Sequence, residues 1–123
     1  MIVDSNIIIY AVQQEHAQLR DFIAVHAPAV SAASYVEVLG YHKLTEPREE
    51  RLRRFFSLTT VLPIDQDVLD QAVHLRQQHK MSLCDALIAA TAMVHRLTLV
   101  THNVADFDWI DGLTILDPLA EEI

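Results

Sequence analysis

Residues 1–10 read MIVDSNIIIY, a short apolar run followed by three polar side chains and a second apolar run. Ile2 and Val3 are β-branched, and no polar residue alternates with them, which favours a strand covered on both faces in a parallel sheet. Asp4 would then lie at the carboxyl end of this strand, where open α/β sheets bind their ligands. A carboxylate beside such an apolar strand is costly unless it is paired or coordinated. We therefore expect the rest of the chain to supply groups that offset this cost.

The size and composition of the chain fit one soluble domain. Its 123 residues are 51% hydrophobic, which is enough for a core, so we expect a single domain spanning residues 1–123. No segment approaches the roughly 20 apolar residues of a membrane span, and an acid at position 4 replaces the basic start of a signal peptide. We expect a cytoplasmic protein with no membrane partner.

The charge balance limits how the chain could bind nucleic acid. The sequence has 17 Asp and Glu against 9 Lys and Arg, a formal net charge of -8, which argues against broad electrostatic attraction to a polyanion. If nucleic acid is the substrate, cations must mediate its binding. Gly40 and Gly112 are the only glycines, so a glycine-rich phosphate loop is excluded. Cys84 is the only cysteine, which excludes an internal disulfide and a cysteine zinc cluster.

Strand and helix patterns alternate along the chain. Short β-branched runs predict strands, and apolar residues at helical spacing predict the helices between them. The expected strands are residues 2–3, 29–31, 59–64, 98–101 and 113–116, and the expected helices are residues 7–12, 15–26, 33–44, 47–58, 67–79 and 82–95. This order predicts an α/β fold with a mostly parallel sheet.

Four acids stand in apolar contexts or at the ends of expected elements: Asp4, Glu37, Asp85 and Asp106. They come from separate parts of the chain, and only folding could bring them together. The carboxyl edge of a parallel sheet is where strand ends and the following helix starts converge. Several carboxylates on rigid elements suit a hard divalent cation such as Mg²⁺, which could polarise a phosphate and activate water.

Two of these acids also have a purely structural explanation. Ser34 precedes Glu37 by three residues, and Ser82 precedes Asp85 by three, which is the spacing of a capping box at a helix start. A cap does not exclude metal binding, because an acid in a first turn is also stabilised by the helix dipole. Both explanations stay open for these two positions.

Four segments of the chain resemble the PIN-domain nuclease family, in particular the VapC-like toxins of bacterial type II toxin–antitoxin pairs. They are residues 2–7, IVDSNI, residues 31–38, SAASYVEV, residues 83–92, LCDALIAATA, and residues 99–107, LVTHNVADF. Together, in this order, they are specific and cover essentially the whole chain. The resemblance implies a PIN-like three-layer α/β/α sandwich with a mostly parallel central sheet.

The same resemblance implies a metal-dependent endoribonuclease toxin that hydrolyses RNA phosphodiester bonds with metal-activated water. The implied ligands of Mg²⁺ or Mn²⁺ are Asp4, Glu37, Asp85 and Asp106, with Asn6, Thr101 and Asn103 as polar support. Position 102 is His where relatives often carry Arg, and position 103 is Asn where many carry an acid. The fourth acidic place therefore falls on Asp106, and a three-acid centre with Asn103 orienting a ligand stays open. The implied partners are RNA, a cognate small antitoxin and a second copy of the chain in a homodimer. We expect the antitoxin to lay an amphipathic helix on apolar surface of the first helices, with an Arg side chain reaching the carboxylates in place of the cation. The expected contact residues are Ile8, Ile9, Leu19, Phe22 and Tyr35.

Three other functions also stay open. A catalytically silent PIN-like binding module would lack at least one site acid, and a housekeeping nuclease would have no antitoxin. A phosphoryl-accepting receiver module would need paired acids after the first strand and a lysine near the last strand. Here Asp4 is single, and no lysine follows Lys80.

Overall fold

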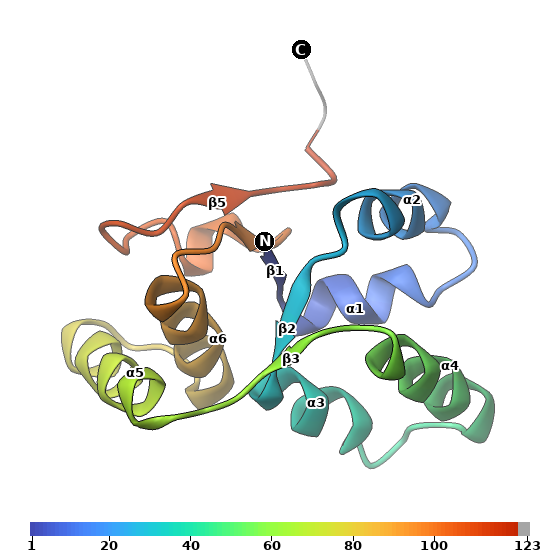
Figure 1. The fold of residues 1–123 in the computed structure, drawn as a ribbon, viewed down its shortest axis with the longest axis horizontal. Coiled ribbons are helices and arrows are strands. Elements are labelled where there is room, and N and C mark those ends of the chain that lie inside the picture. The colour runs from blue at the N-terminus through green and yellow to red at the C-terminus, as the bar shows by residue number, and fades with distance from the viewer. Residues whose placement is uncertain (121–123) are drawn as a thin grey trace.

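The stretch that opens the chain is the central strand of a parallel sheet. The computed structural model describes residues 1–120, which contain a five-stranded sheet with the spatial order β3-β2-β1-β4-β5 (Figure 1). All four pairings are parallel. The strands are β1 Ile2–Val3, β2 Ala29–Ser31, β3 Val61–Leu62, β4 Leu99–Val100 and β5 Ile115–Leu116. Several are shorter than expected, because few residues in each run pair with a neighbour.

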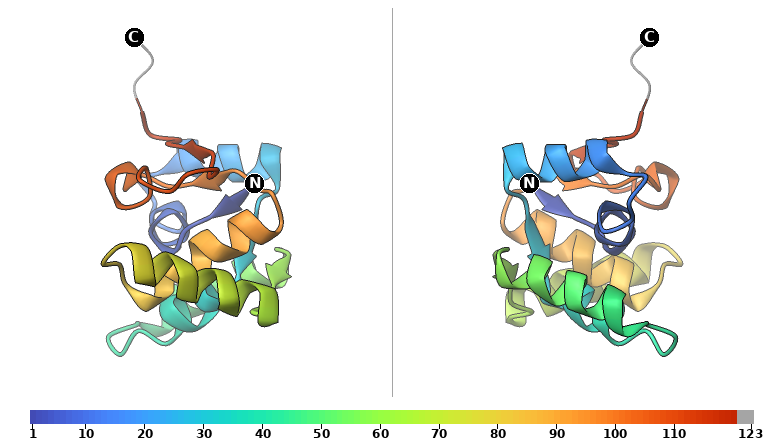
Figure 2. Two further views of the ribbon diagram at one scale, coloured as in Figure 1. Left: turned by 90° about the vertical axis from the view of Figure 1, so that its left-hand side faces the viewer. Right: turned by 90° about the vertical axis from the view of Figure 1, so that its right-hand side faces the viewer.

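Helices connect the strands as the sequence patterns predict. Residues 1–120 form α1 Ser5–Ala11, α2 Ala17–His26, α3 Ala32–Leu39, α4 Glu46–Ser57, α5 Gln66–Gln78, α6 Leu83–Val94 and the short 3-10 helix η1 Val104–Asp106. Helices α1 to α4 lie on one side of the sheet, and α5 and α6 lie on the other (Figures 1 and 2). The expected three-layer α/β/α arrangement with a parallel central sheet is confirmed.

Each central strand serves two hydrophobic cores. Successive side chains of a strand point to opposite faces, so Ile2 packs on the α5–α6 side while Val3 packs on the side of α1 to α4. Leu99 and Val100 of β4 divide in the same way. Because both faces are covered, the strands are continuous apolar runs without polar alternation. This is why the first apolar run predicts a buried strand correctly.

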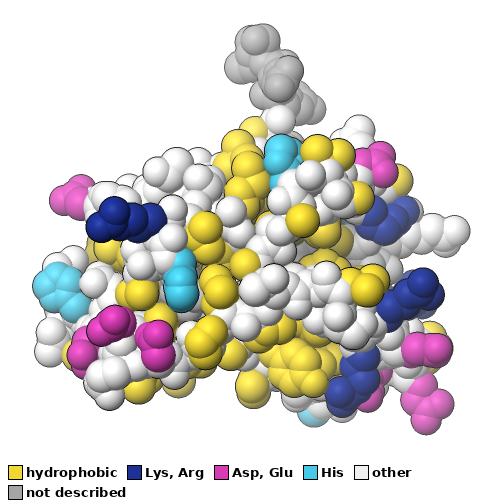
Figure 3. Space-filling model, in the orientation of Figure 1, with side chains coloured by type: hydrophobic (Ala, Val, Ile, Leu, Met, Phe, Trp, Pro, Cys, Tyr) yellow, Lys and Arg dark blue, Asp and Glu magenta, His cyan; other side chains and the backbone are white. Residues whose placement is uncertain are grey.

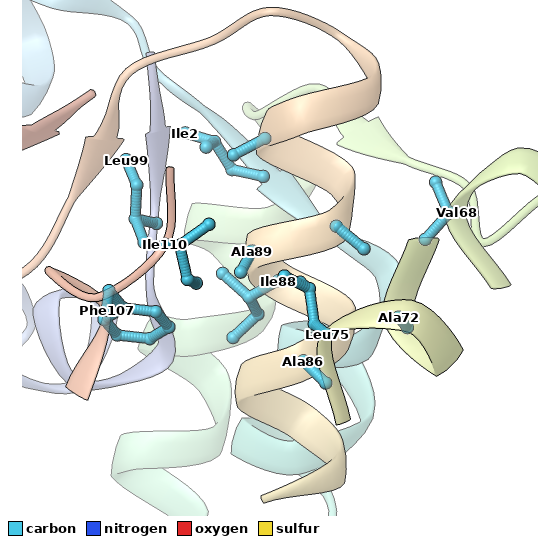
Figure 4. Close-up of a cluster of buried hydrophobic side chains, with 12 residues drawn as sticks. Ile2, Val68, Ala72, Leu75, Ala86, Ile88, Ala89, Leu99, Phe107 and Ile110 are labelled. Atoms are coloured by element: carbon cyan, nitrogen blue, oxygen red, sulfur yellow. The ribbon is translucent and has the colours of Figure 1, made fainter. Parts of the chain in front are cut away.

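Helix α6 is buried between the sheet and α5. Its Ile88 and Ala89 are almost fully buried, between Ile2 and Leu99 of the strands and Leu75 of α5 (Figure 4). Small residues dominate the buried positions of this helix. Their size lets α6 approach the sheet closely, which fixes the position of its first turn at the carboxyl edge of the sheet.

Helix α3 is shorter than the expected helix 33–44. It ends at Leu39, and Gly40 is its C-cap. The Gly40 N–H donates to the Val36 carbonyl oxygen at 2.8 Å, and a Cβ added at position 40 would lie 2.4 Å from that same oxygen. The chain turns here in a conformation that excludes a side chain, and the apolar residues at 41–44 belong to the connection to α4.

Two further expectations concern the extent of the chain. Within residues 1–120, every helix is too short or too polar to span a bilayer. The expected single domain runs to residue 123, and its last three residues lie outside the described part of the chain.

Gly40→Ala should destabilise the fold, because the added methyl group meets backbone that cannot rotate away. Overpacking of this kind costs about 1–3 kcal/mol, which chemical denaturation of the purified protein would measure. Lys43→Ala, an exposed change in the same connection, is the matched control and should leave the free energy of unfolding unchanged. Equal stability of Gly40→Ala and wild type would contradict the steric reason given for the end of α3.

Candidate active site

Asp4 is the most constrained of the four acids. It follows β1, caps α1, and has a side chain only 4% exposed. Its Oδ1 accepts a hydrogen bond from the Ile7 backbone N–H at 3.0 Å, and its Oδ2 accepts one from the Thr101 hydroxyl at 2.5 Å. Burial raises the pKa of Asp4, and these two hydrogen bonds offset part of that rise. The carboxylate is therefore held in one orientation at the carboxyl edge of the sheet.

Thr101 links Asp4 to the next strand along the sheet. It follows β4, is fully buried, and its backbone N–H bonds to the Leu116 carbonyl at 3.0 Å. Its Oγ1 also accepts the Asn103 backbone N–H at 3.0 Å. Asn103 thus supports Asp4 through its backbone amide. Asn6 lies in the first turn of α1 and is exposed.

Glu37 and Asp85 lie on two different helices that pack against each other. Glu37 is exposed on α3, and Asp85 is half-buried in the first turn of α6. The N-cap of α3 is Ser31 rather than Ser34, so the capping explanation for Glu37 is wrong. Ser82 does cap α6, because its Oγ accepts the Asp85 backbone N–H at 3.1 Å. Asp85 therefore has a structural role that leaves its carboxylate available.

The four acids lie within electrostatic range of one another. Burial is the largest cause that raises the pKa of Asp85, and the negative charges of Asp106, Glu37 and Asp4 raise it further. Glu37 and Asp106 likewise add to the raised pKa of Asp4. Coulombic repulsion weakens with distance and with solvation, so these effects place the four carboxylates around one region at the carboxyl edge of the sheet. The fold thus brings together four acids that are far apart in the sequence.

Within residues 1–120, no Lys, Arg or His forms an ion pair with this cluster of acids. Among residues 1–120, the ion pairs join Arg53 to Glu49 and His102 to Asp117, and neither includes one of the four acids. Oxygen donors with uncompensated negative charge are the ligands that Mg²⁺ and Mn²⁺ prefer. The donor type and the charge of the described residues therefore fit a hard divalent cation.

The acids do not form a closed metal cage within residues 1–120. No three His, Cys, Asp or Glu side chains within residues 1–120 are close enough together to hold one metal ion directly. Glu37 and Asp106 are exposed, so the surrounding protein leaves room for their side chains to turn toward a cation. Mg²⁺ usually keeps several waters in such sites, which lets it bridge carboxylates that do not all touch it.

Cys84 lies beside this cluster of acids, and its thiol is unreactive. Burial, followed by the nearby charge of Glu37, raises the pKa of its thiol to about 12. Its Sγ points to the Ala33 carbonyl oxygen at 3.8 Å. A thiol with this pKa is protonated at neutral pH and is a poor nucleophile. Cys84 therefore acts as a packing residue between α3 and α6.

Divalent cations should stabilise the fold if the four acids share a site. At a Mg²⁺ concentration about 100-fold above its Kd, mass action adds about 2.7 kcal/mol, which is several degrees of melting temperature. Thermal unfolding across millimolar Mg²⁺ and Mn²⁺ measures this effect. An unchanged melting temperature of the wild type would count against a shared site.

Asp85→Asn should change both the metal-free melting temperature and its response to Mg²⁺. The pKa of Asp85 is raised in the folded chain, so its stabilising contribution exists at low pH and is lost as the pH rises through that pKa. At neutral pH the neutral amide removes the repulsion, and the metal-free variant should melt at or above the wild-type temperature but gain less from Mg²⁺. Asp70→Asn, an exposed change on α5, is the control and should respond to Mg²⁺ like the wild type.

Three solved structures that are similar to this chain are a toxin–antitoxin complex and two VapBC complexes. A chain of a toxin–antitoxin complex from Klebsiella pneumoniae is 32% identical, with a TM-score of 0.76 over 95% of this chain and 96% of that chain. VapBC2 from Rickettsia felis, bound to a DNA fragment from its promoter, is similar at 22% identity and a TM-score of 0.83, covering 94% of this chain and 96% of that one. DNA-bound VapBC from Salmonella typhimurium is similar at 21% identity and a TM-score of 0.81, covering 95% and 96%.

The similarities to the two VapBC structures, at 22% and 21% identity, concern the fold alone. No curated protein matches the sequence significantly. A family model described as the PIN domain matches residues 1–113, which include β1, α3, α6 and η1 and all four acids. The resemblance seen in the sequence is therefore confirmed: this chain belongs to the PIN domain family.

Proposed function

We propose that this chain is a Mg²⁺- or Mn²⁺-dependent endoribonuclease and the toxin of a type II toxin–antitoxin pair. Its class as a nuclease rests on membership of the PIN domain family. The observation that carries the proposal is the cluster of Asp4, Glu37, Asp85 and Asp106, which repel one another and have no basic partner among residues 1–120. Such a cluster is costly for stability and is retained where it serves a metal-dependent reaction.

The four acids would act as ligands, with Asp4 the fixed one. Thr101 and the first turn of α1 hold both oxygens of Asp4, whereas Glu37 and Asp106 can adjust to an incoming cation because they are exposed. A divalent cation bound there would polarise the scissile phosphate and lower the pKa of a bound water. Without a cation, four carboxylates would repel the phosphate of the RNA, so the metal requirement follows from the charge of the site.

Replacing a ligand acid by its amide should abolish RNA cleavage while the fold persists, because the amide keeps the shape but loses the charge. We expect losses of about 100-fold or more for Asp4→Asn, Glu37→Gln and Asp85→Asn, and a smaller loss for Asp106→Asn. Cleavage of total RNA with Mg²⁺ or with a chelator, together with circular dichroism of each variant, measures this.

The control for these variants is Asp70→Asn, which should cleave like the wild type. Full cleavage by Asp4→Asn or Asp85→Asn would remove the proposed mechanism. A wild type that binds Mg²⁺ but cleaves no RNA would favour a silent binding module. Cleavage by a chain that is harmless to its cell and binds no neighbouring gene product would favour a housekeeping nuclease.

An antitoxin is the partner that the comparisons favour. The structure from Klebsiella pneumoniae that is 32% identical to this chain is itself a toxin–antitoxin complex. The sequence predicts that this partner docks on apolar side chains of the first helices, namely Ile8, Ile9, Leu19, Phe22 and Tyr35. The prediction is wrong for Ile8 and Leu19, because both are fully buried in the core. The homodimer stays a prediction.

A groove between α1, α2 and α4 offers an accessible apolar surface instead. Its volume is about 890 Å³, and its apolar lining includes Val12, Ile23, Ala24, Phe55 and Leu58. A groove of this size suits the apolar face of an amphipathic helix. We therefore place the apolar face of the antitoxin helix in this groove. The groove lies at the Ala11 end of α1 and Asp4 lies at the other end, so a further segment of the antitoxin would carry a basic side chain, Arg by preference, to the acids in place of the cation.

The rim of the groove is basic. Arg20 and Arg51 both line it, and on the face in Figure 3 most Lys and Arg side chains lie toward the α2 and α4 side. Arg20 bonds to the carbonyls of Ala11, Gln13 and Gln14 at 3.2, 2.5 and 3.1 Å, so its position is fixed. This charge favours a segment with acidic residues flanking its apolar face.

A charge placed in the groove should weaken antitoxin binding. Leu58 is 80% exposed and lines the groove, whereas Val25 is 78% exposed and lies outside its lining. Both are at the end of a helix, where a cation is tolerated. Leu58→Lys should raise the Kd for the antitoxin encoded beside this chain at least about tenfold, and Val25→Lys should leave it unchanged. Calorimetry measures both, and equal Kd values would exclude the groove.

A further inference from the structure

Trp109 contacts two segments that are distant in the sequence. Its indole Nε1–H donates to the backbone carbonyl of Asp106 at 3.0 Å. Its ring stacks on the imidazole of His79, with the ring centroids 4.5 Å apart and an interplanar angle of 15°. One side chain thus joins the turn that carries Asp106 to the end of α5.

His79 in turn belongs to the segment that leads into α6. It is the C-cap of α5, and Asp85 follows six residues later in the first turn of α6. This connection is held in place by its own hydrogen bonds: Arg76 Nε donates to the Met81 carbonyl at 3.3 Å, and His79 Nδ1 lies 2.9 Å from the Lys80 carbonyl. The His79–Trp109 stack therefore connects the approach to Asp85 with the turn that carries Asp106.

Asp106 and the residue that follows it differ in burial. Phe107 is 1% exposed and anchors the end of η1 in the core, whereas the Asp106 side chain is exposed. Burial alone does not explain the stack, because His79 is itself exposed. Phe107 on one side and the indole hydrogen bond on the other fix the backbone of Asp106 while its carboxylate remains free to reach a ligand.

We propose that His79 and Trp109 form a latch that positions Asp106 for the divalent cation. The latch consists of the ring stack and the hydrogen bond from Trp109 to the Asp106 carbonyl. Both are positioning residues, since neither touches the cation. The inference rests on the proposed metal site, and it predicts that loosening the latch lowers the affinity for Mg²⁺ more than the stability of the fold.

Trp109 reports on this site directly, because it is the only tryptophan in the chain. Titrating the purified protein with Mg²⁺, without RNA, should change the Trp109 emission in a saturable way as Asp106 is drawn to the cation. Asp106→Asn should remove that change. His79→Ala should raise the Mg²⁺ concentration at half-saturation about three- to tenfold, which corresponds to the loss of an aromatic stack.

Further variants test whether His79 and Trp109 affect Mg²⁺ binding or only the packing of the fold. His79→Phe keeps an aromatic ring for the stack and should restore the wild-type Mg²⁺ midpoint. Trp109→Phe keeps a ring but loses the N–H donor, and the Mg²⁺ midpoint of RNA cleavage should rise about three- to tenfold. His74→Ala is the matched control, because His74 is exposed on the same helix and bonds only locally to Gln78 at 2.7 Å.

The outcomes distinguish the latch from the proposed nuclease. A shifted emission midpoint in His79→Ala, without RNA cleavage by any form, supports the latch and overturns the nuclease. Metal-dependent cleavage with unchanged midpoints in His79→Ala and Trp109→Phe supports the nuclease and overturns the latch. A lower melting temperature with an unchanged midpoint also overturns the latch, because it leaves these residues a structural role alone.

Discussion

The hydrogen bond from Thr101 to Asp4 is the contact on which the site depends. It joins the ends of β1 and β4, 97 positions apart in the sequence, at a length of 2.5 Å. The same carboxylate caps α1 through Ile7. Because one buried side chain completes a helix start and links two strands, the position of Asp4 is determined by the fold itself. The other acids are arranged around this fixed group.

Burial sets the chemistry of this arrangement. The pKa values of Asp4 and Asp85 are raised chiefly by desolvation, and the remaining acids add repulsion. In the metal-free chain, the energy of these interactions opposes folding. The two hydrophobic cores on either side of the sheet must offset it. The small residues of α6 contribute to both effects, because they bring Asp85 close to the sheet while burying the helix.

The sequence predicted the fold class and most elements, and its errors have physical causes. Residues 2–3 were recognisable as a covered strand because both faces of the sheet are packed. The end of α3 was missed, because apolar residues continue to Leu44 and the steric constraint at Gly40 is a contact with Val36. Ile8 and Leu19 were expected at a partner surface, but helical spacing alone does not reveal which apolar faces the other helices cover. They lie in the core.

The sequence by itself determined the alternation of strands and helices, because local patterns of polarity encode it. It also determined which four acids are the candidate ligands, because they lie in short motifs that resemble the PIN family. Only the tertiary structure decided that the acids lie within electrostatic range of one another, that Thr101 orients Asp4, and that Trp109 connects Asp106 to His79. These relations depend on distances between residues on different elements. Chain folding sets such distances, and no local pattern in the sequence encodes them.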